Sequence, residues 1–157
     1  MTEKINIRRL YEEIKSKYRQ LPDFDKINHD FEVEFIDKEH FILRQIRRRV
    51  NEKIIFFCRV TEGILFPAGN SAINAYESES FSEEKRKEIS EIHKQLMILE
   101  RKALMLDIDS SELDDVNFIC EVFKVWPDFK VKLNEVASIM QKAWTKEDEK
   151  HENGYYG

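Results

Sequence analysis

The sequence predicts a mainly α protein, in which a helical bundle is followed by a small, reduced β-containing module. The 157 residues include only four glycines and three prolines, fewer than a turn-rich β fold needs. Charged residues make up 36% of the chain and hydrophobic residues 41%, which suits a folded protein with a core. Several long stretches also repeat their apolar residues at helical spacing.

Residues 37–63 are predicted to form one long helix, with Asp37 as its N-cap and Gly63 at its end. The alternative is a hairpin that turns at residues 50–52, but the flanking segments do not alternate and the turn has no Asn-Gly or Asp-Gly pair. Lys53 interrupts the apolar sector, which indicates neighbours on two sides of the helix, some from another chain. That sector contains Ile42, Leu43, Ile46, Val50, Ile54, Phe57, Val60 and Ile64.

The other elements are predicted from shorter patterns. Residues 3–20 should form a helix that Thr2 caps, and the FEVEFI run within residues 23–36 should be extended. Residues 66–81 contain turn residues and should form a loop. Ser82 should then open another helix, whose apolar face is formed by Ile89, Ile92, Leu96, Leu99, Ala103 and Leu106.

The predicted domain organisation follows from changes in composition. Residues 1–106 form the helical domain, and residues 107–116 form an acidic linker that contains DIDSSELDD. Residues 117–145 form a small β-like module, with two short strands hinged at Pro127 and then a short helix. Residues 146–157 form a polar, frayed tail.

The β-like module carries more apolar side chains than two isolated strands can bury. These side chains must therefore pack on the helical domain or on another chain. We expect docking onto a partner protein. The alternative is that the module folds by itself around a small core, which Val136, Ile139 and Trp144 would close. The candidate partner-binding residues of this module are Phe118, Val122, Trp126 and Phe129.

No catalytic, cofactor-binding or metal site is predicted, and we expect no enzyme activity. The four histidines are scattered, and the two cysteines form no disulfide framework. The net charge of −5 gives no basic field, so direct DNA binding should be weak or absent. No uncharged run approaches a membrane span and the N-terminus lacks an apolar signal core, so we expect a cytoplasmic protein away from the membrane.

A cluster of arginines is the sharpest feature of the sequence. Arg44, Arg47, Arg48 and Arg49 lie near Lys53, and the only acidic residue among them is Glu52. These charges have three competing explanations. They solvate an exposed helix face, they pair with acidic residues of a partner subunit, or they contact DNA phosphates. We therefore treat the four arginines as candidate partner-binding residues.

Three stretches resemble subunits of the GINS complex of DNA replication that place a helical domain before a small β domain. The stretches are IRRLYEEIKSKYRQLP, KEHFILRQIRRRVNEKIIFFCRVTEGILFP and FSEEKRKEISEIHKQLMILER, within roughly residues 5–106. The second is similar to a family helix that is rich in leucine, isoleucine and arginine and closes before a proline. The third has a similar Ser-x-Glu-type start at Ser82. The bias toward lysine, isoleucine and glutamate looks archaeal.

The resemblance implies a non-enzymatic subunit without a cofactor, which assembles with a sister GINS subunit into a tetramer. The tetramer would hold an MCM-type helicase to a RecJ-like partner. It would be nucleoid-associated in an archaeon and nuclear in a eukaryote. Residues 115–145 depart from the family pattern, because they are shorter than its β domain and contain no glycine.

Two other functions stay open at this point. An unrelated helical adaptor would share the helices and exist as a stable monomer or homodimer. A small α-β-β-β-α nucleic-acid-binding domain would require residues 37–66 to form strands.

Overall fold

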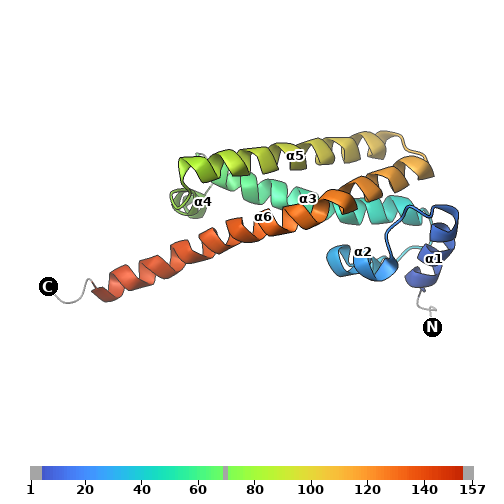
Figure 1. Cartoon of the computed structure of the whole chain (residues 1–157), viewed down its shortest axis with the longest axis horizontal. Helices are drawn as coiled ribbons and strands as arrows, with labels where there is room; N and C mark the ends of the chain where they lie inside the picture. The colour runs from blue at the N-terminus through green and yellow to red at the C-terminus, as the bar shows by residue number, and fades with distance from the viewer. Residues whose placement is uncertain (1–4, 69–70, 154–157) are drawn as a thin grey trace. The chain divides into compact units, whose positions relative to one another are not determined.

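The computed structural model describes residues 5–68 and 71–153, with side chains described as far as residue 145. These residues form six α-helices, one 3-10 helix and no strand, which confirms the mainly α prediction (Figure 1). The elements are α1 (Ile7–Lys17), α2 (Phe24–Phe31), the 3-10 helix η1 (Val33–Phe35), α3 (Ile42–Leu65), α4 (Ala72–Ser78), α5 (Glu83–Ile108) and α6 (Glu112–Asn153).

The chain divides into two compact units, and each unit is discontinuous in sequence. Unit 1 comprises Met1–Phe56 and Leu96–Trp126, and unit 2 comprises Phe57–Gln95 and Pro127–Gly157. Helices α3, α5 and α6 therefore each contribute residues to both units.

Helix α3 confirms the helical prediction for the long middle segment and excludes the hairpin. It begins at Ile42, so Asp37 is not its N-cap, and it continues two residues past Gly63. The alternative of an α-β-β-β-α domain, which requires residues 37–66 to form strands, is therefore wrong. Lys53 donates to the backbone carbonyl of Asp30 and lies 5.8 Å from the ring centroid of Phe31. The residues that contact Lys53 on α3 therefore belong to α2 of the same chain and not to another chain.

Two of the shorter predictions need correction. The FEVEFI run is not extended, because α2 continues to Phe31 and η1 follows it. Glu32 separates these helices in a left-handed conformation, with a φ of 52°. The predicted loop 66–81 contains helix α4, whose N-cap Ser71 accepts a hydrogen bond from the backbone N–H of Asn74. In both cases, one local capping interaction favours a short helix that a hydropathy pattern misses.

The starts of α1 and α5 follow the expected capping chemistry. The side chain of Asn6 caps α1 by accepting the backbone N–H of Arg9 at 3.0 Å, and Thr2 lies outside the described residues. Ser82 caps α5 as predicted, because its Oγ accepts the backbone N–H of Lys85 at 3.2 Å. The first turn of α5 therefore has a partner for one of its unpaired backbone donors.

The predicted β-like module is wrong, because residues 117–145 belong to α6. Its apolar residues are alternately three and four positions apart. This spacing places them on one side of a helix, whereas a strand would have apolar residues at every second position. The helix continues through the exposed Pro127 at the loss of one backbone hydrogen bond. The buried or half-buried seam consists of Ile119, Val122, Trp126, Phe129, Leu133, Val136, Met140 and Ala143.

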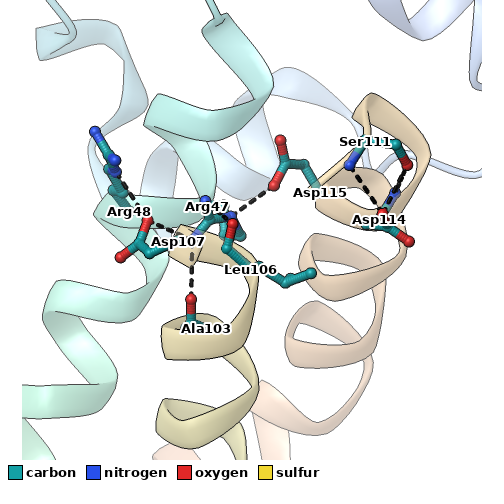
Figure 2. Close-up of polar contacts among 8 residues, drawn as sticks. All are labelled: Arg47, Arg48, Ala103, Leu106, Asp107, Ser111, Asp114 and Asp115. Atoms are coloured by element: carbon teal, nitrogen blue, oxygen red, sulfur yellow. Dashed lines mark hydrogen bonds and ion pairs between the residues drawn. The ribbon is translucent and has the colours of Figure 1, made fainter. Parts of the chain in front are cut away.

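The acidic segment between α5 and α6 is a tight helix connection. Helix α5 ends at Ile108 and α6 begins at Glu112. The carboxylate of Asp114 accepts the backbone N–H of Ser111 at 2.8 Å and its hydroxyl at 2.7 Å (Figure 2). The Oγ of Ser111 accepts the backbone N–H of Asp114 in return, at 3.2 Å. This reciprocal capping box fixes the start of α6.

Unit 2 has a small apolar core formed by Ile64, Phe81, Ile89 and Val136. Arg86 closes it by donating to the backbone carbonyls of Ile64 at 3.3 Å, Phe81 at 3.4 Å and Ser78. The first and last of these carbonyls lie at the ends of α3 and α4, so the arginine serves as a side-chain cap for both helices.

Candidate interaction surface

Arg47 is the one candidate arginine whose side chain is entirely buried, at 0% exposure. Its Nε–H donates to Oδ1 of Asp115 at 2.6 Å, and Nη1 donates to Oδ1 of Asp107 at 3.0 Å (Figure 2). The guanidinium also donates to the backbone carbonyls of Ala103 at 3.3 Å and Leu106 at 3.4 Å. Arg47 therefore joins α3 to the end of α5 and the start of α6 within unit 1.

The carboxylates of Asp107 and Asp115 neutralise the positive charge of the Arg47 guanidinium, which is not exposed to solvent. Asp115 is itself buried, so the pair is stable only because each ion neutralises and hydrogen-bonds the other. Burial alone would raise the pKa of Asp107. Hydrogen bonds from Arg48 and Arg47 outweigh that effect and hold the pKa of Asp107 below its ordinary value. The fork of the arginine side chain matches this mixture of carboxylates and carbonyls better than a lysine would.

The acidic partners of Arg47 come from the chain itself. Asp107 and Asp115 both belong to the segment predicted as a linker. None of the three explanations for the arginine cluster describes Arg47, because each of them placed its charge at the surface. Arg47 is therefore not an exposed candidate for partner binding.

Arg44, Arg48 and Arg49 line one open groove in unit 1, with a volume of about 760 Å³. Arg48 pairs with Asp107 at 3.1 Å and Arg49 pairs with Glu52 at 3.3 Å. Among the described residues, no carboxylate pairs with Arg44, whose guanidinium carbon lies 5.1 Å from the ring centroid of Phe41. The structure thus brings these three arginines together at one surface.

The apolar candidates of α6 lie in the interior. Phe118, Val122, Trp126 and Phe129 are each 3% exposed or less. The ring of Trp126 packs against that of Phe31 in α2, with their centroids 5.0 Å apart. Because these side chains are covered by their own chain, they offer a partner no surface in this conformation.

Helix α5 presents a second apolar face in unit 1. Leu96, Leu99 and Ala103 are buried on one side of the helix. At about 100° per residue, the exposed residues fall on the opposite side. They are Ile98, Leu104, Met105 and Ile108, with exposures of 49%, 51%, 69% and 81%. We call these four residues the outer face of α5.

Neither a metal centre nor a membrane-spanning helix is found in the described part of the chain. In the described part of the chain, no group of three or more histidine, cysteine, aspartate or glutamate side chains is placed to hold a metal ion. No helix among those residues is both long and apolar enough to cross a bilayer. Comparisons with protein families, curated proteins and solved structures found no match.

Three features of unit 1 are absent from the predictions made on the sequence. The spacing of Ile98, Met105 and Ile108 was a readable signal, because residues seven and then three apart share a helix face. The pairing of Arg47 with Asp115 joins residues far apart in the chain, and no local pattern indicates it. The exposure of Phe41 depends on a backbone conformation that its residue type does not favour.

Proposed function

We propose that the chain is a non-enzymatic subunit that works by binding other protein chains. The observation that carries this proposal is the outer face of α5. A helix with apolar residues on opposite sides is normally covered on both, and exposed apolar patches mark interaction sites. Within unit 1, only one side of α5 is buried.

The occupant that we propose for the outer face is a helix of a sister subunit in a GINS-like complex. The resemblance over residues 5–106 supports this choice, as does the helical architecture of that region. The assembled complex would scaffold an MCM-type helicase and contact a RecJ-like partner, with little or no direct DNA binding by this chain. Contacts that the family makes through a β domain are not part of the proposal, because α6 occupies that part of the sequence.

A helical adaptor of an unrelated family is the second candidate. It is favoured by one observation, which is that Glu112–Asn153 form a single helix in place of a small β domain. Such an adaptor would use the same outer face of α5 but bind a different partner. The two candidates therefore differ in the identity of the partner and agree on the surface.

The experiment is co-expression of the full chain with a sister GINS subunit, followed by size-exclusion chromatography with light scattering. We expect a hetero-complex that the double substitution Met105→Glu with Ile108→Glu disrupts, because two charges would be buried at the contact. Lys87→Glu changes an exposed position of the same helix and serves as the matched control.

The outcomes separate the candidates. A complex with the sister subunit that also retains an MCM-type helicase supports the GINS-like function. A defined complex with an unrelated purified partner, lost in the double variant, supports the adaptor. A chain that stays monomeric beside every candidate partner, with identical behaviour of both variants, contradicts the proposal. Gel-shift binding of DNA below about micromolar at physiological salt would contradict the statement on DNA.

A further inference from the structure

The arginine-lined groove of unit 1 has a chemical character that differs from the outer face of α5. Two exposed phenylalanines, Phe35 and Phe41, share the groove with Arg44, Arg48 and Arg49. An adjoining groove of about 510 Å³ shares Phe41 and Arg44, so this pair lines both hollows. The surface therefore offers aromatic rings and guanidinium groups side by side.

The walls of the groove are held in place before any ligand binds. The side-chain amide of Gln45 donates to the backbone carbonyls of Lys38 at 3.1 Å and of His40. The backbone N–H of Glu34 donates to the side chain of Asn28 at 2.9 Å, which fixes the 3-10 turn that carries Phe35. A pre-formed wall reduces the entropy that a ligand must overcome on binding.

Phe41 adopts a conformation that bulky residues avoid. Its φ is 55°, in the left-handed region, where a residue with a bulky side chain carries an energetic cost. Burial of the ring does not offset this cost, because Phe41 is 73% exposed. The conformation instead presents the ring at the surface beside the guanidinium of Arg44.

The charges of the groove select among ligands. Arg48 and Arg49 already have carboxylate partners, whereas within residues 5–68 and 71–145 the contact of the Arg44 guanidinium is with the ring of Phe41. The lining also contains Asp37, Glu39 and Glu52. A continuous polyanion such as nucleic acid would meet these carboxylates, whereas a peptide can place a carboxylate at Arg44 and an apolar side chain elsewhere.

We propose that this groove binds an acidic peptide segment of a partner protein. A carboxylate of the segment pairs with Arg44, and a neighbouring aromatic or aliphatic side chain packs on Phe35 and Phe41. Charge-assisted hydrogen bonds and aromatic contact area are the features that make such sites specific. The groove shares no residue with the outer face of α5, so this proposal stands or fails separately from the proposed function.

The test is fluorescence anisotropy of the full chain with a dye-labelled peptide of repeated Glu-Phe-Glu-Leu units. A matched peptide with lysine in place of glutamate and an oligothymidine strand are the comparison probes. We expect the glutamate peptide to bind best, more weakly as salt rises. Arg44→Gln and Phe41→Ala should each weaken its binding at least about tenfold. Arg19→Gln, an exposed arginine outside the groove, should change nothing.

Unfolding of each variant, followed by circular dichroism, separates lost binding from lost fold, since only a folded variant counts. Three results would overturn the proposal. One is the absence of glutamate-peptide binding up to about millimolar concentration. The second is binding that folded Arg44→Gln and Phe41→Ala proteins both retain. The third is tighter binding of the oligothymidine strand, which would make the groove a nucleic-acid site.

Discussion

Arg47 and Arg44 lie one helical turn apart on α3 and have opposite environments. Arg47 is buried against two aspartates and two backbone carbonyls, whereas Arg44 lines an open groove beside Phe41. In a helix, a shift of three residues rotates a side chain by about 60°, which here separates interior from surface. A run of identical residues can therefore contain both a buried structural group and a group that lines a surface groove.

The largest expected effect comes from removing the buried member of the cluster. Arg47→Met leaves the buried carboxylate of Asp115 without its arginine donor and removes one hydrogen bond from each of the carbonyls of Ala103 and Leu106. We expect the free energy of unfolding to fall by about 3–5 kcal/mol, measured by urea denaturation. Arg48→Met should lower it by less than ~1 kcal/mol, because Arg48 is largely exposed. Similar losses in both variants would remove the distinction between buried and exposed arginines.

Arg86 provides the same kind of comparison in unit 2. Its guanidinium donates to the backbone carbonyls of Ile64, Ser78 and Phe81 and to the hydroxyl of Ser78 at 2.8 Å. Arg86→Met should cost about 1–3 kcal/mol of unfolding free energy, because the four hydrogen bonds of a half-buried guanidinium are lost, although the carbonyls of Ile64 and Ser78 keep the hydroxyl of Ser78 and the backbone N–H of Phe81 as donors. The exposed Lys87→Met should stay within about 0.5 kcal/mol of the unsubstituted protein. Equal stabilities of the two variants would show that Arg86 does not close the unit 2 core.

A pair of substitutions at Phe41 isolates its backbone strain. Phe41→Gly and Phe41→Ala both remove the ring, but only glycine also removes the Cβ that disfavours the left-handed conformation. We expect the glycine variant to be more stable than the alanine variant by about 1 kcal/mol in urea denaturation. An alanine variant of equal or greater stability would mean that Phe41 is not strained, and the groove would lose one of its arguments.

Asp107 should produce the smallest effect, visible only in acid. Its pKa is below the ordinary value in the folded chain, so its ionised form stabilises the fold at pH values above about 4. That stabilisation is lost as pH falls through the lowered pKa. Solvent screening keeps it below ~1 kcal/mol, since Asp107 is 37% exposed. The stability gap between the original chain and Asp107→Asn should therefore shrink in acid. A stability difference that grows as the pH falls would contradict the lowered pKa of Asp107.

Much of the helical architecture was predictable from local pattern, and its exceptions have physical causes. Helices α1, α3 and α5 followed from one-sided apolar spacing, and Ser82 followed from capping chemistry. The β-like module is wrong because the β-branched and aromatic residues of this segment recur at helical spacing, and because Pro127 lies within α6 and does not end it. The capping box of Ser111 and Asp114 was also readable and would have predicted the start of α6.

The candidate site was less predictable than the fold. The arginine cluster was visible in the sequence, and three of its members do line a groove. The sequence does not identify the buried member of the cluster, because its partner Asp115 is distant in the chain and lies in a segment whose composition is typical of a linker. Local patterns report helix faces, and they do not report which distant charge meets which face.

The most direct measurement is a double-mutant cycle between Arg47 and Asp115. It compares the unfolding free energies of Arg47→Met, Asp115→Leu, the double variant and the unsubstituted chain. Arg47→Met leaves the buried carboxylate of Asp115 unpaired, whereas Asp115→Leu leaves Arg47 with Asp107 as its remaining carboxylate partner among the described residues. If Arg47 and Asp115 pair, the double variant is more stable than the sum of the two single effects predicts, by at least about 2 kcal/mol. Additive losses, within about 0.5 kcal/mol, would mean that the two residues do not pair and would contradict the assignment of Asp115 as the buried partner of Arg47.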